Sequence, residues 1–198
     1  MSQANASSDQ RLHILAAARN IISSKGYSAV GLTEILAAAQ VPKGSFYYYF
    51  KSKDAFGEAL ISHYFQEYLD RMDALFSSTD KTAAQCLLEY FGNWQAAQET
   101  NDCQGRCLAV KLGAEVADLS EAMRLSLKAG AQGVVSRLTK AIQNGLNDGT
   151  VSIDCEAELA ANTLYQLWLG ASWLAKITRN NEPFLNAFAT TKHYLKIN

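Results

Sequence analysis

The sequence has few of the residues whose abundance is typical of fibrous or linker-rich proteins. It has only 2 prolines and 12 glycines in 198 residues, which excludes a collagen-like or linker-rich chain. Charged residues make up 19% and hydrophobic residues 48%, the opposite of the balance found in disordered chains. No apolar run approaches the roughly 18 residues that a membrane-spanning helix needs. The N-terminus is polar and lacks a basic start or an apolar segment, so we expect no secretory signal and a cytoplasmic protein.

Metal-binding and catalytic side chains are also scarce, with 4 cysteines and 3 histidines. The cysteines form no C-x-x-C pair and have no histidine close by, so we expect no zinc site. In the cytoplasm they are expected to be reduced thiols. His13, His63 and His193 are scattered, and their spacing builds neither a catalytic triad nor a metal cluster. We therefore expect no metal and no cofactor.

Charge is distributed unevenly although the net charge is only −1. Residues 1–54 contain six Lys/Arg and three Asp/Glu, whereas the other residues contain twelve and sixteen. The first quarter is thus a basic module on an acidic body, which favours an anionic partner for the N-terminal part. An excess of this size is also small enough to arise by chance.

The apolar pattern is helical almost throughout, which predicts an all-α protein of about nine helices. Polar residues 7–9 are expected to begin the first helix, with Leu12, Leu15 and Ile22 on its buried stripe and Gly26 at its end. Thr33 is the expected N-cap of the second helix. The other expected helices span residues 43–49, 53–76 (after a cap at Ser52), 81–98, 104–116, 121–147, 156–178 and 183–196. We divide the chain into residues 1–52 and a larger helical domain, residues 53–198.

Residues 27–54 place two short helices around a tight turn, the helix-turn-helix arrangement whose second helix enters the DNA major groove. Lys43, Gly44 and Ser45 open that second helix with a cation and accessible backbone N–H groups, which suit phosphate oxygens. Phe46 and Phe50 are four residues apart and are expected to fix this helix to the first and second helices. The three tyrosines between them cannot all be buried, so at least one or two hydroxyls are available to DNA.

The segment from Val41 to Asp54, V-P-K-G-S-F-Y-Y-Y-F-K-S-K-D, resembles the signature of TetR-family repressors, as does G-Y-x-x-x-G-L-T-E-I from Gly26 to Ile35. The resemblance implies a dimer that binds a palindromic operator, with the last two long helices forming the dimer interface. It also implies that a specific set of residues contacts DNA, namely Thr33, Lys43, Gly44, Ser45, Tyr47, Tyr48, Tyr49 and Lys53. The alternative is that the tyrosines only pack and that Lys53 is a solvated residue at a helix start.

Cys103 and Cys107 are four residues apart and share a helical face if this turn is helical. With Asn101 or Asp102 as a cap, both thiols would lie at the positive end of the expected helix 104–116. A helix N-terminus and nearby cations both stabilise a thiolate, the reactive form. The alternative is that each cysteine is a small buried hydrophobic residue, which is what we expect of Cys86 and Cys155.

The stretch C-L-x-V-K-L-x-A-E-V-x-D-L-S-E-x-M-R, from residue 107, and W-L-G-A-x-x-x-A-K-I-x-R, from residue 168, are similar to the N-ethylmaleimide-responsive repressors of the TetR family. Those proteins respond to electrophiles and oxidants such as quinones, aldehydes and chlorine oxidants. The resemblance matches their regulatory thiol to Cys107 and a nearby lysine to Lys176. One departure is Arg106, because glycine usually precedes the matched thiol.

Two other functions stay open on the sequence. Four aromatic residues form a possible pocket for a reversibly bound aromatic or lipophilic inducer, or fill the core or the dimer interface: Tyr90, Tyr165, Trp168 and Trp173. A thiol-dependent enzyme with Cys107 as nucleophile is disfavoured because no catalytic base accompanies it, so we expect a regulator that is not an enzyme.

Overall fold

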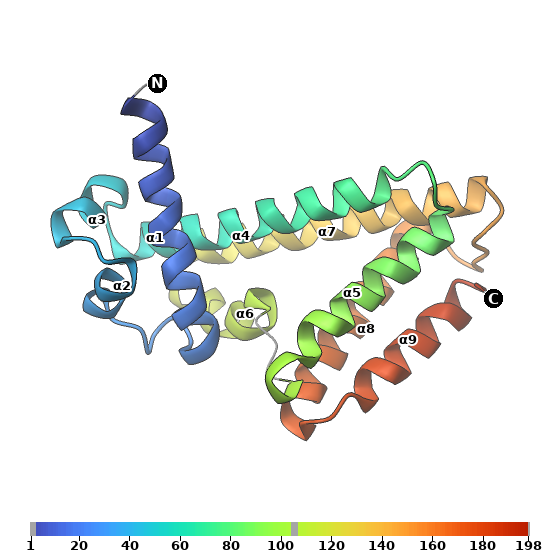
Figure 1. Cartoon of the computed structure of the whole chain (residues 1–198). Coiled ribbons are helices and arrows are strands. Elements are labelled where there is room, and N and C mark those ends of the chain that lie inside the picture. Colours follow the sequence, from blue (N-terminus) through green and yellow to red (C-terminus); the bar gives the residue numbers. More distant parts are fainter. Residues whose placement is uncertain (1–2, 104–106, 198) are drawn as a thin grey trace. The chain divides into compact units, whose positions relative to one another are not determined.

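The computed structural model describes the backbone of residues 3–103 and 107–197 and the side chains of residues 9–97 and 107–197. Within these residues the regular structure is nine helices and no strands, which confirms the all-α prediction (Figure 1). No helix in the described part of the chain has the length and apolarity to cross a membrane. The helices are α1 (Gln3–Lys25), α2 (Leu32–Ala39), α3 (Lys43–Tyr49), α4 (Lys53–Phe76), α5 (Ala83–Cys103), α6 (Leu108–Leu119), α7 (Glu121–Asn147), α8 (Ala157–Thr178) and α9 (Glu182–Tyr194).

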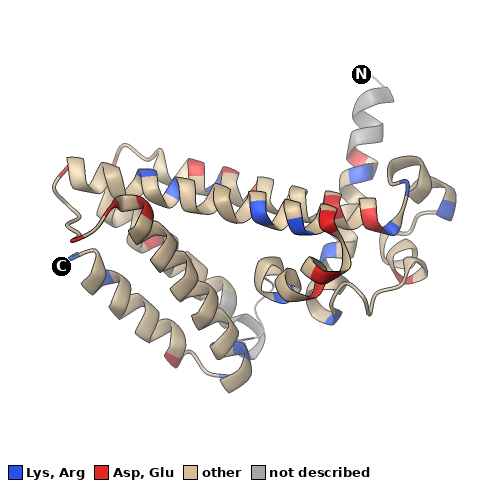
Figure 2. Cartoon of the chain, turned by 180° about the vertical axis from the view of Figure 1, so that it is seen from behind, with Lys and Arg blue, Asp and Glu red and all other residues tan. Residues whose placement is uncertain are grey.

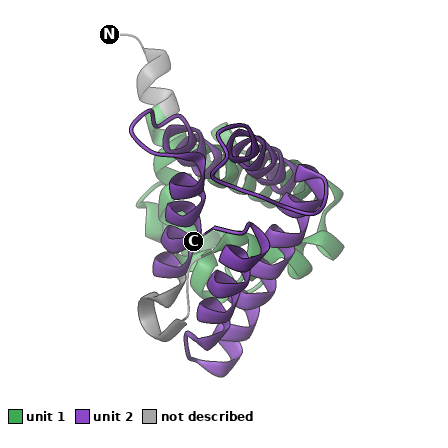
Figure 3. Ribbon diagram, turned by 90° about the vertical axis from the view of Figure 1, so that its right-hand side faces the viewer, with its two compact units in different colours: residues 1–66, 106–129 green, residues 67–105, 130–198 purple. Residues whose placement is uncertain are grey.

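The chain forms two compact units (Figure 3). Unit 1 consists of residues 1–66 and 106–129, and unit 2 of residues 67–105 and 130–198. The three N-terminal helices that we assigned to residues 1–52 therefore share a unit with the first part of α4, with α6 and with the start of α7. Helix α6 is distant from them in sequence but belongs to the same compact body.

Unit 1 is built on the apolar stripe of α1 and on three phenylalanines. Ile14, Leu15 and Ile22 are fully buried, whereas Leu12 is 37% exposed, so the prediction that Leu12 belongs to the stripe is wrong. The rings of Phe46, Phe50 and Phe56 lie 5.1–5.3 Å apart between centroids and are buried. This cluster fixes α3 to the start of α4, a contact that the spacing of Phe46 and Phe50 did not predict. Of the two helices that it did predict as partners, α1 contacts the cluster through Arg11, whose guanidinium lies 5.3 Å from the centre of the Phe50 ring.

The ends of the N-terminal helices follow local backbone chemistry. Helix α1 stops before Gly26, whose φ of +95° is open to glycine but strained for other residues. Helix α2 begins after Gly31 without a side-chain cap, so the prediction of Thr33 as N-cap is wrong, and Thr33 is the second residue of the helix. Ser52 does cap α4, because its Oγ accepts a hydrogen bond from the Ala55 N–H at 3.0 Å.

The border between α5 and α6 differs from the expected one. Helix α5 continues to Cys103 instead of stopping near residue 98, and α6 begins at Leu108 with Cys107 as its N-cap residue. Asn101 and Asp102 therefore lie inside α5 and do not cap α6. The long helices α4 and α7 have the predicted bounds.

Unit 2 has an aromatic core centred on Trp168 of α8. Its side chain is fully buried, stacks on Phe91 of α5 at 4.9 Å and lies 6.1 Å from Phe184 of α9. Its indole N–H donates to Thr191 Oγ1 at 2.9 Å, so the buried polar atom is satisfied. The core thus joins α5, α8 and α9, and α8 packs directly on α9 (Figure 1).

Candidate DNA-binding surface and sensing helix

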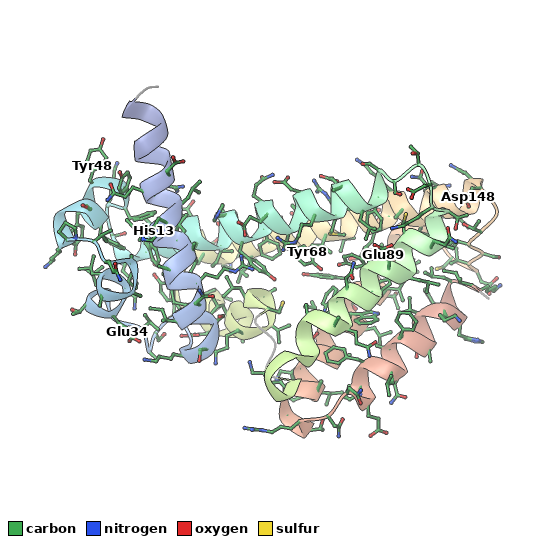
Figure 4. All side chains as sticks on the ribbon, viewed as in Figure 1. His13, Glu34, Tyr48, Tyr68, Glu89 and Asp148 are labelled. Carbon is green, nitrogen blue, oxygen red and sulfur yellow. The ribbon has the colours of Figure 1, made fainter. Side chains whose placement is uncertain are left out.

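Helix α3 presents two tyrosines to solvent. Tyr47 is 47% and Tyr48 75% exposed, whereas Phe46 on the other side of the helix is fully buried. Figure 4 shows Tyr48 pointing away from the helices of unit 1. Because Phe46 anchors α3, the two exposed phenol hydroxyls are held in fixed positions at the surface. They are free to donate to phosphate or base-edge acceptors, as predicted from the impossibility of burying all three tyrosines.

Tyr49 has a different role from its two neighbours. It is half-buried, and its hydroxyl donates to Gln10 Oε1 of α1 at 3.1 Å. Its ring meets Tyr48 edge-to-face at 4.9 Å between centroids. Tyr49 therefore holds α3 against α1 and supports the ring of Tyr48.

The start of α3 and the start of α2 are accessible. Lys43 and Gly44 are exposed, Ser45 is half-buried, and Thr33 on α2 is exposed. The Lys43 ammonium lies 5.8 Å from the centre of the Tyr47 ring, so cation and phenol form one surface. Lys51, exposed in the turn before α4, adds a cation that was not among the predicted contacts. Figure 2 shows how the basic and acidic residues are distributed along the helices.

Lys53 is half-buried at the first position of α4 and is held by Tyr27. Its ammonium donates to the Tyr27 carbonyl at 3.2 Å and lies 4.7 Å from the centre of the Tyr27 ring. The Tyr27 hydroxyl donates in turn to the Lys53 carbonyl. Burial, together with the charge of Asp54, raises the pKa of the Tyr27 hydroxyl, which keeps it protonated as a donor. Two of the three ammonium protons remain available to an external acceptor.

His13 is a positioning residue that the sequence did not reveal. Its Nε2 lies 2.9 Å from the carbonyl of Ala39, the last residue of α2, so the ring N–H on this atom donates to α2. This contact fixes the end of α2, from which the turn leads into α3. A histidine on a helix face carries no spacing signal that distinguishes this role from a solvated side chain.

Cys107 is half-buried at the start of α6. Its carbonyl accepts the Lys111 N–H at 2.9 Å, and its Sγ lies 3.5 Å from the hydroxyl of Tyr64 on α4. The guanidinium of Arg19, on α1, lies 5.0 Å from the centre of the Tyr64 ring. The thiol is thus in contact with the same tyrosine on which a cation of α1 rests, an arrangement within unit 1 that sequence spacing did not predict.

The other predicted sensing residues lie apart from Cys107 along the chain. Cys103 ends α5 and Cys107 is the N-cap residue of α6, so the two do not lie on one helix, which was the condition for a shared helical face. The side chain of Cys103 and Arg106 lie outside the described residues. Lys176 is half-buried in the last turn of α8, in unit 2, whereas Cys107 belongs to unit 1.

The two remaining thiols differ from one another. Cys86 is buried, and this burial raises the pKa of its thiol, as expected for a cysteine that acts as a small hydrophobic residue. Cys155 is half-buried, and its Sγ lies 3.3 Å from the Tyr194 hydroxyl. No group of three His, Cys, Asp or Glu residues that would hold a metal occurs among the described residues.

The aromatic residues predicted for a pocket do not share one environment. Trp168, Tyr90 and Tyr165 are buried in unit 2. The hydroxyls of Tyr90 and Tyr68 are hydrogen-bonded to each other, with 2.8 Å between the two oxygens. Trp173 is 57% exposed on another face of α8. A surface depression of about 670 Å³ in unit 2 lies elsewhere, lined by Asp154, Cys155, Lys192, His193, Tyr194, Lys196 and Ile197.

Helices α8 and α9 carry large apolar side chains that a single chain leaves in water. On α8 these share one face and are 46–57% exposed: Leu159, Trp173, Leu174 and Ile177. Leu185 of α9 is 54% exposed. Gly170, also on α8, has open space where a side chain would stand. Exposed apolar surface of this kind marks a site of protein association.

Comparison with known proteins agrees with this arrangement. Residues 14–60 match the model of the bacterial regulatory proteins of the tetR family, and residues 83–191 match the tetracyclin repressor-like C-terminal domain. The HTH-type transcriptional repressor NemR of Escherichia coli K12 is 40% identical over 192 residues, covering 94% of both chains. The HTH-type transcriptional repressor DhaR of Mycobacterium sp. is 33% identical, over 91% of this chain and 88% of the relative.

Solved structures show the same fold. The reduced form of E. coli NemR superimposes with a TM-score of 0.90 at 39% identity, covering 94% of this chain and 97% of that one. A regulatory protein TetR from Rhodobacter sphaeroides gives 0.84 at 28% identity, covering 92% and 97%. With helix-turn-helix, regulatory domain and full-length relatives in agreement, this chain belongs to the TetR family of bacterial transcriptional regulators.

Proposed function

We propose that this protein is a dimeric repressor that releases a palindromic operator when an electrophile or oxidant modifies Cys107. The observation that carries the proposal is the position of this thiol. It is half-buried at the start of α6, in contact with Tyr64 of α4, within the unit that also holds the helix-turn-helix. Similarity to NemR, whose name describes a transcriptional repressor, supports the repressor part of this proposal.

The DNA-facing part of the proposal rests on α3. Tyr47, Tyr48 and Lys43 are exposed together, and Phe46 fixes their helix. One such helix contacts a single half-site. A two-fold dimer formed through the apolar face of α8 presents two copies, and its operator is then palindromic.

The chemical step is addition of the thiolate to a conjugated electrophile. With p-benzoquinone, the Cys107 sulfur forms a bond to a ring carbon, the electron pair of the C=C bond moves to a quinone oxygen, and the thiol proton together with the ring proton ends on the two oxygens. The product is a hydroquinone thioether, and no other oxidant or reductant is consumed. An added ring beside Tyr64 overfills a packed contact, which costs about 1–3 kcal/mol. A shift of α6 would relieve this strain.

The test uses a duplex that the wild-type protein selects from a random-sequence pool, called the selected duplex below. Wild type, Cys107→Ser and the matched controls Cys86→Ser and Cys155→Ser are titrated with p-benzoquinone while fluorescence anisotropy reports DNA binding and intact mass reports adducts. We expect release by wild type and both controls but not by Cys107→Ser. Release by Cys107→Ser equal to that of wild type would refute the covalent mechanism.

The alternative is a repressor induced by reversible binding of an aromatic or lipophilic molecule. In unit 2 the candidate pocket residues pack against one another, with Trp168 fully buried and its indole N–H bonded to Thr191. That packing favours a core role for them. A cysteine-free variant that still released the selected duplex on adding an aromatic ligand, without a gain in mass, would establish the alternative.

A further inference from the structure

The carboxylate of Glu115 on α6 binds the loop between α1 and α2. Glu115 Oε2 accepts the Tyr27 N–H at 3.1 Å, and Oε1 accepts the Ser28 N–H at 2.6 Å. Both carboxylate oxygens are thus used on consecutive backbone amides of one loop. All three residues belong to unit 1.

The loop is shaped to receive an anion. Gly26 has a φ of +95°, and a positive φ at this point turns successive N–H groups toward one concave side, a backbone nest. A Cβ on Gly26 would stand 3.0 Å from Glu115 Oε2, closer than ordinary contact. The backbone conformation therefore favours glycine here, and any other residue would also press on the end of the Glu115 side chain.

Glu115 is an anion in this setting. Burial by itself raises the pKa of its carboxyl, but the hydrogen bonds from Ser28 and Tyr27 and the charge of Lys111 outweigh burial, so the pKa lies below its ordinary value. At neutral pH the carboxylate and the two amides form charge-assisted hydrogen bonds, which are stronger than neutral ones.

Tyr27 is bound by Glu115 and itself binds Lys53. The Tyr27 N–H binds Glu115, while the Tyr27 carbonyl accepts from the Lys53 ammonium at 3.2 Å. The Tyr27 ring lies 4.7 Å below the same ammonium. Displacing the Tyr27 backbone therefore displaces the support of a cation at the first position of α4.

We propose that Glu115 is a positioning residue for DNA binding, which acts through Tyr27 to place the Lys53 ammonium against a backbone phosphate. The proposal rests on the proposed function. In this proposal α6, whose N-cap residue is Cys107, is linked through Glu115 and Tyr27 to a DNA-contacting cation. The end of α6 also contacts α4 without the help of Glu115, because the Ser120 hydroxyl donates to Asp54 Oδ2 at 2.8 Å. This hydrogen bond keeps α6 attached when Glu115 is replaced.

The experiment measures how binding of unmodified protein to the selected duplex depends on salt. Each phosphate contact contributes about 0.9 to the slope of log K against log salt concentration. Loss of the Lys53 contact from both protomers should therefore lower the slope by about 2. We compare wild type with Glu115→Gln, Lys53→Met and the double variant. The matched control is Glu121→Gln, because Glu121 is exposed and pairs with Arg124 on its own helix.

We expect Glu115→Gln and Lys53→Met to lower the slope equally, the double variant to lower it no further, and Glu121→Gln to match wild type. A wild-type slope in Glu115→Gln, or additive losses in the double variant, overturns the proposal. If Glu115→Gln loses its cooperative thermal transition, Glu115→Asp replaces it, since it keeps the charge but is too short to reach the two amides. Wild-type protein that selected no duplex would instead refute the proposed function.

Discussion

Replacing Trp173 by alanine should break the dimer without unfolding the chain. This side chain is 57% exposed on α8 and lies on the same apolar face as Leu159 and Ile177. It takes no part in the aromatic core centred on Trp168. Its removal therefore deletes surface that this chain leaves exposed and that a second copy covers in the proposed dimer.

The magnitude follows from the exposed area. A tryptophan side chain has up to about 250 Å² of surface, so an exposed fraction of 57% leaves roughly 140 Å² per chain. In a two-fold dimer both copies count, and about 25 cal/mol per Å² gives an upper limit of about 7 kcal/mol. Association also costs side-chain freedom, so we expect about 4 kcal/mol, which is roughly a thousandfold rise in the dimer Kd.

The assay is sedimentation equilibrium over a dilution series, with circular dichroism to check helix content. Leu119→Ala is the matched control, because Leu119 is 55% exposed but belongs to α6 of unit 1 and not to the apolar face of α8. We expect Trp173→Ala to dissociate at concentrations where wild type and Leu119→Ala remain dimeric. Equal dimer Kd values for all three would refute the assignment of this face to the interface.

Three further predictions address the DNA-binding unit. Tyr48→Phe should lower affinity for the selected duplex at least about tenfold by losing one hydrogen bond from each protomer of the dimer, with unfolding free energy within about 0.5 kcal/mol of wild type, as checked by anisotropy and urea titration; unchanged affinity would remove Tyr48 from the interface. Phe46→Ala should lower the unfolding free energy in urea by about 3–5 kcal/mol, because Phe46 is fully buried against Phe50 and Phe56, and a loss below about 1 kcal/mol would contradict that packing. The Glu115 pKa is lowered on folding, so its stabilisation is fully present above the ordinary value of 4.5 and is lost as the pH falls through the folded value. Urea midpoints between pH 6 and pH 3 should therefore fall more steeply in wild type than in Glu115→Gln, and parallel curves would count against the hydrogen bonds to the loop.

Local signals in the sequence were sufficient for most helix bounds in this chain. Ser52 offers its hydroxyl to the first turn of α4, and the Phe46–Phe50 spacing puts both rings on one side of α3. Such features act over one or two turns and therefore show in the sequence. The same reasoning failed at Asn101 and Asp102, where polar residues that favour caps lie inside α5.

Contacts between distant segments could not be predicted in this way. Glu115 and Tyr27 are 88 positions apart, and the sequence around neither residue indicates the other as its partner. The Tyr64 hydroxyl beside Cys107 is 43 positions away in sequence. Trp168 and Trp173 are both apolar residues of α8, and only the packing of unit 2 shows which one is core and which is surface.

The central claim is that the chemical state of Cys107 sets the affinity for DNA. The most direct measurement isolates protein carrying one p-benzoquinone adduct on Cys107, verified by peptide mass, and compares its Kd for the selected duplex with that of the reduced protein. Coupling of 1–3 kcal/mol predicts a Kd about 5- to 150-fold higher for the adduct. Equal Kd values for the adduct and the reduced protein would contradict the account.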